Sequence, residues 1–533
     1  MDLGFPPAAA ARRRVLSAPA GAFAALAVPA AADGDAFLLE SALADGRLGR
    51  WSFAGREPLA RLAGWRGRAP GAGLDLELEV RREPDGSRPA APRRVAWHGD
   101  PFAALRTVLA AYRSDDDAGA PAEDGGPPSP GAPPFSGGLV GWFGYGVAWA
   151  LERLPRHAAP APDGAPDLLF LVFDDVLALD LAGDRATLSV TGRGADADAA
   201  ARDLAGREEA WRRRLAGAGD ATDAAGAPPV RAAREGPTGP SLPALDGVAA
   251  AWDAAAYGAA VSRCREHILA GDAFEICLTQ PLAAPLPAGP WRLYAALRAL
   301  NPAPFAAFLR AGEYFVAGAS PERFLRVDRD GRLESRPIKG TRPRGATPAA
   351  DAALKADLAT AAKDAAENTM IVDLVRSDLG RVARIGSVAV PELGAVETYA
   401  TVHQLVSTVT ARLRPDRDAL DAVRACFPPG SMTGAPKVEA MAIIESLEPA
   451  SRGVYSGALG WLGWDGALDL SVVIRTFVGR AGGPAGVTFG VGGAVTADSE
   501  PEAEYRESLD KARALLAALR RAAAAETTQE GSA

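Results

Sequence analysis

The chain has 533 residues, of which 48% are hydrophobic, and a formal net charge of −8. Its length allows two domains, or one large two-layer domain with a substantial core. The negative net charge argues against nucleic acid or an anionic membrane as the main partner, because both carry charge of the same sign.

The cysteines and the hydropathy pattern give further exclusions. The three cysteines at 264, 277 and 426 form no CxxC pattern, which predicts a reducing, cytoplasmic setting and no thiolate metal site. Arginines at 12–14 precede an alanine-rich apolar segment, but Pro19 and Pro29 interrupt it and argue against a signal peptide. No apolar run reaches 18 residues, so no membrane span is predicted.

The first half of the chain predicts mainly short strands. Residues 1–112 alternate apolar stretches with turns, the clearest strands being DAFLLES at 35–41 and WSF at 51–53. The glycine-spaced aromatic stretch at 137–151 predicts close backbone packing in a sheet. Further expected elements are strands at 168–175 and 187–191 and a polar-faced helix at 197–215.

Two segments of biased composition interrupt these elements. Residues 115–132 are acidic and then rich in proline and glycine, which predicts a surface insertion without regular structure. Residues 217–245 are rich in alanine, glycine and proline and predict a linker. The resulting division is an N-terminal region at 1–216, the linker at 217–245, a C-terminal domain at 246–525 and a tail at 526–533.

The second half has the sharper pattern. Helices are predicted at 254–270, 291–300, 348–376, 418–426, 435–447 and 500–524. Strands are predicted at 274–279, 305–309, 314–317, 324–327, 332–335, 402–413, 454–464, 468–478 and 486–495. Because long strands are grouped with helices between them rather than in strict alternation, we predict an α+β fold, a large β-sandwich with helices packed on the outside.

One stretch in this half concentrates unusual residues around a lysine. ESRPIKGTRPRG, at 334–345, places Lys339 between prolines and glycines that exclude a helix and indicate a stiff turn. Two interpretations compete. Lys339 is either an ordinary cationic loop residue or a nucleophilic amine whose pKa is lowered by burial or by a cationic neighbour.

Two predicted helices carry pairs of carboxylates three residues apart. Asp364 and Glu367 share one helix face, and Glu504 and Glu507 share another. If the two faces turned towards each other, they would form an all-oxygen site of the kind that Mg²⁺ prefers. The competing interpretation is that both faces are simply solvated, as most acidic helix faces are.

Other polar features suit an anionic ligand. GSMTGAPK at 430–437 lacks the spacing of a nucleotide phosphate loop, but a glycine loop before a helix can bind a carboxylate. GVGGA at 490–494 could act in the same way. Arg475 is a charge inside an apolar strand and needs a partner. His403, also in a strand, is either a satisfied core histidine or a general acid.

These features occur in motifs that resemble those of the chorismate-utilising enzymes. That family includes component I of anthranilate synthase, component I of aminodeoxychorismate synthase, and the isochorismate and salicylate synthases. The motifs are SPERF (320–324), PIKGTRPRG (337–345), AENTMIVDLVRSDLGRV (366–382), GSMTGAPKVEAM (430–441), YSGALGW (455–461), VVIRT (472–476) and EAEYRESLDKAR (502–513). The resemblance implies the family's fold, with an N-terminal region and a C-terminal chorismate-binding catalytic core.

Lys339 discriminates among the family's reactions. Anthranilate synthases typically carry PIAGT, whereas aminodeoxychorismate synthases typically carry PIKGT, as here. The resemblance implies that Lys339 attacks carbon 2 of chorismate and expels the carbon 4 hydroxyl, after which ammonia adds at carbon 4 and the lysine leaves. The product would be 4-amino-4-deoxychorismate, a precursor of p-aminobenzoate and folate. An anthranilate synthase component and a non-catalytic chorismate-binding subunit stay open as alternatives.

The resemblance also implies roles for individual residues. Glu322 would be the proton donor, and His403 would lie near the leaving group. Glu367 and Glu507, supported by Glu504, would hold Mg²⁺. Implied substrate contacts are Thr341, Gly434, Tyr455, Arg475, Gly492, Gly493, Ala494 and Lys511. Glu275 takes the approximate place of a lysine that isochorismate and salicylate synthases use to activate water, which argues against hydration. Ala494 and Ser377 depart from the glycine and asparagine common in relatives.

No glutaminase half is visible in the chain. The family therefore implies a heterodimer in which a separate glutamine amidotransferase subunit supplies the ammonia. FLLES at 37–41 resembles a segment that forms a tryptophan pocket together with NPAPF at 301–305. The residues of that possible pocket are Leu39, Glu40, Ser41, Pro304 and Phe305.

Overall fold

The fold is taken from a computed structural model of the chain. It describes residues 3, 5, 10–18, 34–41, 48–67, 73–113, 132–155, 159–218, 247–287, 289–399, 402–481 and 486–530. Nearly all of the predicted insertion at 115–132 and of the predicted linker at 217–245 lies outside these residues.

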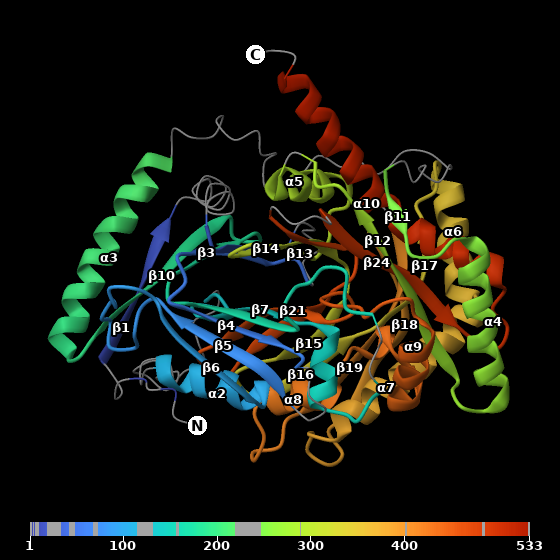
Figure 1. Cartoon of the computed structure of the whole chain (residues 1–533), viewed down its shortest axis with the longest axis horizontal. Coiled ribbons are helices and arrows are strands. Elements are labelled where there is room, and N and C mark those ends of the chain that lie inside the picture. Colours follow the sequence, from blue (N-terminus) through green and yellow to red (C-terminus); the bar gives the residue numbers. More distant parts are fainter. Residues whose placement is uncertain are drawn as a thin grey trace.

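Two large antiparallel sheets form the centre of the described structure (Figure 1). The first contains, in spatial order, β1 (Ala10–Ala18), β10 (Arg185–Gly194), β9 (Val176–Asp180), β3 (Trp51–Arg56), β2 (Ala36–Glu40), β13 (Phe305–Ala311), β14 (Tyr314–Ser320), β23 (Thr476–Arg480), β24 (Val487–Val495), β12 (Glu275–Ala284) and β11 (Ala249–Ala250), with β20 (Gly434–Ala435) beside β12. The second contains β17 (Ile338–Pro343), β19 (Val402–Arg412), β16 (Arg332–Arg336), β15 (Arg323–Val327), β22 (Leu468–Val472), β21 (Ala458–Gly463), β7 (Gly138–Phe143), β8 (Leu168–Phe173), β4 (Ala60–Trp65), β5 (Leu74–Val80) and β6 (Arg93–Gly99), with β18 (Ala389–Thr398) beside β19.

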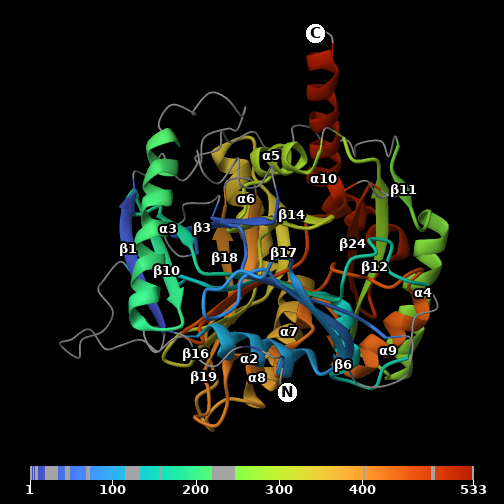
Figure 2. The same cartoon turned by 60° about the vertical axis from the view of Figure 1, so that its left-hand side comes forward.

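Helices cover the outer faces of both sheets, as Figures 1 and 2 show from two directions. Against the first sheet pack α3 (Ala197–Ala218), α5 (Pro290–Leu300) and α10 (Pro501–Glu530). Against the second pack α2 (Pro101–Tyr112), α7 (Ala362–Gly380) and α8 (Ala419–Cys426). The remaining helices are α4 (Ala254–Ala270), α6 (Pro348–Thr360) and α9 (Lys437–Leu447), with short 3-10 turns at η2 (Tyr145–Ala150) and η3 (Gly430–Met432).

Alternation along the strands explains this layering. On β8, Leu168 and Phe170 face the cluster shared with α2 and α7, whereas Leu169 and Leu171 face the layer between the sheets. Phe37 on β2 points into the same inner layer. Because successive side chains point to opposite faces, an all-apolar strand can be buried on both sides. The predicted α+β sandwich with outer helices is confirmed.

Strands from the two halves of the chain share both sheets. In the first sheet β2 pairs with β13, so that Glu40 lies opposite Ala306. In the second sheet β7 pairs with β21, from Gly138 opposite Gly463 to Phe143 opposite Ala458. The position of a domain boundary at 217–245 stays a prediction, because most of that segment lies outside the described residues.

Several elements differ from the sequence-based expectation. The single helix predicted at 348–376 is two helices, α6 and α7, because Ala361 is extended (φ −67°, ψ 105°) and the Thr360 hydroxyl donates back to the carbonyl of Ala356. The single strand predicted at 468–478 is divided between β22 and β23 in different sheets, with Arg475 at φ +53° between them.

Another difference lies in the first half. Residues 101–112 form helix α2 rather than a strand, and its start has a recognisable signal: Asp100 caps the backbone N–H of Phe102 and Pro101 occupies the first turn. The stretch at 137–151 forms β7 as expected but then turns into η2. Among the described residues, no helix is both long and apolar enough to span a membrane.

Candidate active site

Lys339 and Glu275 form a buried ion pair that joins the two sheets. Lys339 lies on β17 of the second sheet, and Glu275 is the first residue of β12 in the first sheet. The Lys339 Nζ donates a hydrogen bond to Glu275 Oε1, and the exposed fractions of the two residues are 8% and 0%. Lys339 is therefore not an ordinary exposed loop residue, and the segment that carries it is a strand rather than a turn.

The charge state of Lys339 differs from the expected one. Burial acts to lower its pKa, but the carboxylates of Glu275 and Glu367 outweigh this effect and leave the pKa raised. The expectation of a lowered pKa is therefore wrong for this arrangement, because the two carboxylates favour the ammonium form of Lys339. An ammonium ion has no free lone pair, so a nucleophilic role for Lys339 would require it to lose a proton first.

The two acidic helix faces do meet, and a lysine lies between them. Lys363 Nζ on α7 lies 3.2 Å from Glu504 Oε1 on α10 and 3.8 Å from Glu367 Oε1. Burial is the main cause that raises the pKa of Glu367 to about 7, with Lys339 opposing it. Asp364 does not join this group, because its carboxylate pairs with Arg342 at 3.0 Å.

Glu504 and Glu507 converge on Gly493 of β24. Glu504 Oε1 accepts from Ser499 Oγ at 2.6 Å, whereas the buried Oε2 has no partner among the described residues. A Cβ atom at Gly493 would lie 3.0 Å from that Oε2 and 3.6 Å from Glu507 Oε1, so the glycine leaves space that a side chain would fill. The Lys511 ammonium, 2.7 Å from Glu507 Oε1, lowers the pKa of Glu507.

This carboxylate set is chemically suited to a hard cation, although a lysine now bridges part of it. Glu367, Glu504 and Glu507 offer only oxygen donors, and the Oε2 of Glu504, which has no partner among the described residues, is buried next to Gly493. Within the described ranges, no group of three or more His, Cys, Asp or Glu side chains is already arranged around a metal position. The donor chemistry thus fits Mg²⁺, and the identity of the ion stays a prediction.

Several of the expected substrate contacts lie around the same carboxylates. Lys511 Nζ donates to the carbonyl of Gly492 at 2.9 Å, and the Arg475 guanidinium donates to the carbonyl of Lys511. Burial lowers the pKa of Arg475. Ala494 pairs with Cys277, two residues after Glu275 on β12. Arg475 lies between β22 of the second sheet and β23 of the first, and so not inside a continuous strand as predicted.

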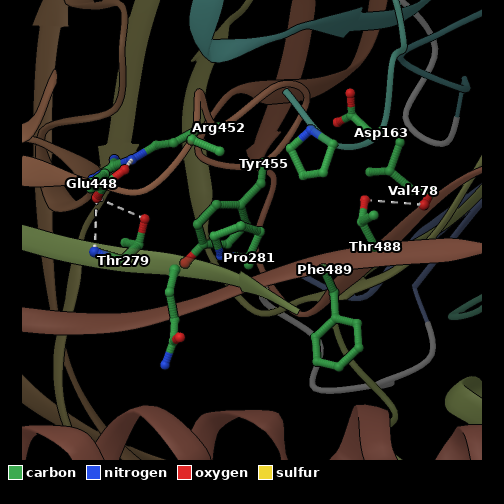
Figure 3. A pocket seen from close by; sticks show the side chains of 13 residues that line it. Asp163, Thr279, Pro281, Glu448, Arg452, Tyr455, Val478, Thr488 and Phe489 are labelled. Carbon is green, nitrogen blue, oxygen red and sulfur yellow. Dashed lines mark hydrogen bonds and ion pairs between the residues drawn. The ribbon is translucent and has the colours of Figure 1, made fainter. Parts of the chain in front are cut away.

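Tyr455 lines a small cavity together with a buried polar network (Figure 3). Glu448 accepts from the backbone N–H of Thr279 at 2.8 Å and pairs with Arg452 at 2.6 Å. Arg452 also donates to the carbonyl of Cys277 at 2.6 Å. The adjoining cavity, of about 20 Å³, has room for roughly one water molecule. Because Cys277 and Thr279 follow Glu275 on β12, this network holds the strand that carries the carboxylate.

The remaining catalytic candidates, Glu322, His403 and Thr341, differ in burial and in their partners. Glu322 is buried, and burial raises its pKa to about 7, so that it can carry a proton near neutral pH. His403 lies 3.0 Å from Asp351 through Nε2 and 3.0 Å from Thr398 through Nδ1, which is the arrangement of a satisfied core histidine. Thr341 is exposed on β17 opposite Gln404.

The segments of the possible tryptophan pocket lie side by side. β2 pairs with β13, and Ser41 Oγ donates to the carbonyl of Pro304 at 3.4 Å. The Glu40 carboxylate is already engaged by groups of the chain itself: Arg298 Nε lies 2.7 Å away and the Tyr294 hydroxyl donates to it at 2.6 Å. Tryptophan binding stays a prediction.

Two residues of the cluster were not predicted as site residues from the sequence, namely Glu275 as the partner of Lys339 and Lys363 as the bridge between helices. One signal could have found the second of these. The chain contains only five lysines, and four of them (Lys339, Lys363, Lys437 and Lys511) form ion pairs with carboxylates. In a sequence this poor in lysine, each lysine within a motif is informative.

The sandwich carries a partly buried cluster of lysines, glutamates and an arginine, a combination of charges suited to a small anionic molecule. Comparison with known proteins agrees. The sequence profile of the chorismate binding enzymes matches residues 82–517. Aminodeoxychorismate synthase of Streptomyces griseus is 49% identical over 386 residues, or 72% of this chain and 50% of that protein. Anthranilate synthase component 1 of Streptomyces coelicolor is 42% identical over 516 residues, or 95% of this chain and 87% of that protein.

A solved structure also resembles this chain. Anthranilate synthase component I from Streptococcus pneumoniae matches with a TM-score of 0.67 at 27% identity, covering 88% of this chain and 92% of that one. This chain belongs to the chorismate binding enzyme family. It spans about half the length of the Streptomyces griseus relative.

Proposed function

We propose that this chain is a component I-type aminodeoxychorismate synthase that converts chorismate and ammonia to 4-amino-4-deoxychorismate. The observation that carries the proposal is Lys339, a buried lysine at the carboxylate cluster of a chorismate binding enzyme. The similarity to the Streptomyces griseus aminodeoxychorismate synthase supports the same assignment.

The proposed reaction uses Lys339 as a covalent nucleophile. Its amine forms a bond to carbon 2 of chorismate while the hydroxyl at carbon 4 leaves with the bonding electrons. Glu322, whose pKa is raised to about 7 by burial, supplies the proton that turns the leaving group into water. Ammonia then bonds to carbon 4 and the lysine nitrogen departs from carbon 2. Covalent catalysis of this kind divides one difficult displacement into two easier ones.

We further propose that Glu367, Glu507 and Glu504 hold Mg²⁺. When bound, the ion would supply positive charge for a carboxylate of the substrate. Around it, Arg475 and Lys511 contribute cationic groups, the Gly492 carbonyl accepts a hydrogen bond from Lys511, and Gly493 presents no side chain towards the carboxylates. Lys363 would have to move away from Glu504 and Glu367 for the ion to bind, since it now lies within 4 Å of both.

The ammonia source and the product's use belong to the same proposal. A separate glutamine amidotransferase subunit, in a heterodimer with this chain, would deliver ammonia, and the product would serve p-aminobenzoate and folate synthesis. An ammonium salt should replace the partner in a simple assay, because the synthase half needs only free ammonia.

The second candidate is anthranilate synthase component I, favoured by the match to the Streptomyces coelicolor protein over 95% of this chain. A product assay separates the two. The purified chain is incubated with chorismate, Mg²⁺ and an ammonium salt, and products are resolved by mass and fluorescence. A non-fluorescent product with the mass of aminodeoxychorismate supports the proposal, whereas fluorescent anthranilate refutes it. Absence of any Mg²⁺-dependent turnover would favour a non-catalytic chorismate-binding subunit.

A further inference from the structure

Lys339 cannot attack as an ammonium ion, so a nearby group must accept its proton. We propose that Glu275 is this group, and that Lys339 and Glu275 act together as nucleophile and base. This inference rests on the function proposed above, and it adds a catalytic role for a residue of the first sheet.

Contact and burial single out Glu275. Its Oε1 accepts the hydrogen bond of Lys339 Nζ, and no other carboxylate of the described residues lies within ion-pair distance of that nitrogen. Its Oε2 is buried and has no partner among the described residues. Glu275 is fully buried, so no bulk water competes for the proton. A carboxylate in hydrogen-bond contact with the amine it deprotonates meets the first requirement of a general base.

The backbone around Glu275 is held firmly. Ala435 lies opposite Glu275 in the β12–β20 pair, and the N–H of Phe274 donates to the carbonyl of Ala435 at 2.7 Å. Gly434 adopts φ +141°, and a Cβ atom there would lie 2.1 Å from the carbonyl oxygen of Glu275. Only glycine permits this approach. The loop that begins with GSMTG therefore fixes the backbone of Glu275, from which its carboxylate reaches Lys339.

The transfer balances without any further reactant. One proton moves from Lys339 Nζ to Glu275 Oε1, giving a neutral amine and a carboxylic acid, and two opposite buried charges vanish together. The freed lone pair forms the bond to carbon 2. When the lysine nitrogen later leaves as a neutral amine, the proton returns from Glu275 and the starting pair is restored. Exclusion of water by a bound ring favours the neutral pair, because burial penalises both charged forms.

Other titratable groups face this pair and must be accounted for in any pH measurement. They are Glu367 on α7, Cys277 on β12, Glu507 on α10 and Glu322, each of which interacts electrostatically with Lys339. We therefore compare variants with the wild-type chain at every pH, so that shared titrations cancel in the ratio of rates.

The test uses full-length E275Q, which keeps the shape of the side chain but cannot accept a proton. Without its internal base, the variant must lose the Lys339 proton to solvent. The ratio of its rate of aminodeoxychorismate formation to the wild-type rate should then rise about tenfold per pH unit and level off above the pKa of Lys339 in the variant. E275D, which retains a carboxylate, should show a ratio independent of pH.

D378N is the matched control. Asp378 and Lys437 form another buried lysine–carboxylate pair, 2.7 Å apart, and the variant should keep the wild-type pH profile. An E275Q profile equal to the wild-type profile overturns the inference. So does a loss of rate that is the same at every pH in a folded variant with unchanged chorismate affinity, because that result means a role other than proton acceptance.

A second readout does not require turnover. Protein labelled with ¹³C at the lysine ε position should give signals from only five lysines, and K339A identifies the signal of Lys339. Its titration should move to lower pH in E275Q, because the anion that raises its pKa is gone while burial remains. An unmoved titration overturns the inference. If the wild-type chain forms anthranilate instead, the proposed function fails, and this measurement still decides whether Glu275 controls the protonation of Lys339.

Discussion

Replacing Lys339 with methionine tests the nucleophile and the buried ion pair in one experiment. The change preserves the length of the aliphatic chain but removes the amine, so formation of aminodeoxychorismate should fall to background. It also leaves Glu275, which is 0% exposed, as a buried carboxylate without its ammonium partner. Breaking a buried pair by removing one member lowers the free energy of unfolding by about 3–5 kcal/mol.

The double variant K339M/E275Q separates the two effects. It removes both charges, so most of the lost stability should return, because replacing a buried ion pair by uncharged groups is often nearly neutral. Its activity should stay at background. Urea denaturation and the product assay measure the two outcomes. If K339M makes aminodeoxychorismate at the wild-type rate, Lys339 is not the nucleophile. If K339M is as stable as the wild-type chain, the description of the pair as a buried charge pair is wrong.

Three further predictions concern single residues. E507Q should weaken Mg²⁺ binding, seen as a higher metal concentration for half-maximal activity; an unchanged metal titration would remove Glu507 as a ligand. Because the pKa of Glu322 is about 7, its proton-donating form is lost as pH rises through that value. The wild-type rate should decline there, and E322Q should lose most of the rate; survival of both the rate and the decline would assign the acid to another group. R298A leaves the buried carboxylate of Glu40 with the Tyr294 hydroxyl but without its cationic partner. The variant should lower the free energy of unfolding by about 3–5 kcal/mol, and an unchanged urea midpoint would contradict that pairing.

Local signals predicted the elements with clear ends. The helix at 254–270 begins after the capping residue Asp253 and ends at Gly271, which has the left-handed conformation that favours glycine. The hairpin turning at Asp330-Gly331 was equally well marked and forms β15 and β16. Both predictions depended on residues within a few positions of the boundary.

Non-local packing decided the features that the sequence did not predict. The break at Ala361 lies in an alanine-rich run in which Thr360 is the one local sign of a helix end, too weak a signal to divide the predicted helix. The strand at 468–478 keeps a continuous apolar pattern although its two parts enter different sheets. For the site, the sequence motifs predicted Lys339, Glu367 and Glu504 as individual candidates, without their contacts. The contact between Lys339 and Glu275 joins strands of opposite sheets, and sequence spacing carries no information about it.

The sharing of both sheets by the two halves of the chain has a consequence for synthesis on the ribosome. β2 and β7 emerge early, but their neighbours β13 and β21 are not made until residues 305–311 and 458–463. Until then each early strand has an unpaired edge, and such edges invite pairing with other chains. Long-range pairing of this kind also slows folding. A nascent chain should therefore gain protease resistance only when translation is nearly complete, and early termination should yield aggregation-prone fragments rather than a folded first half.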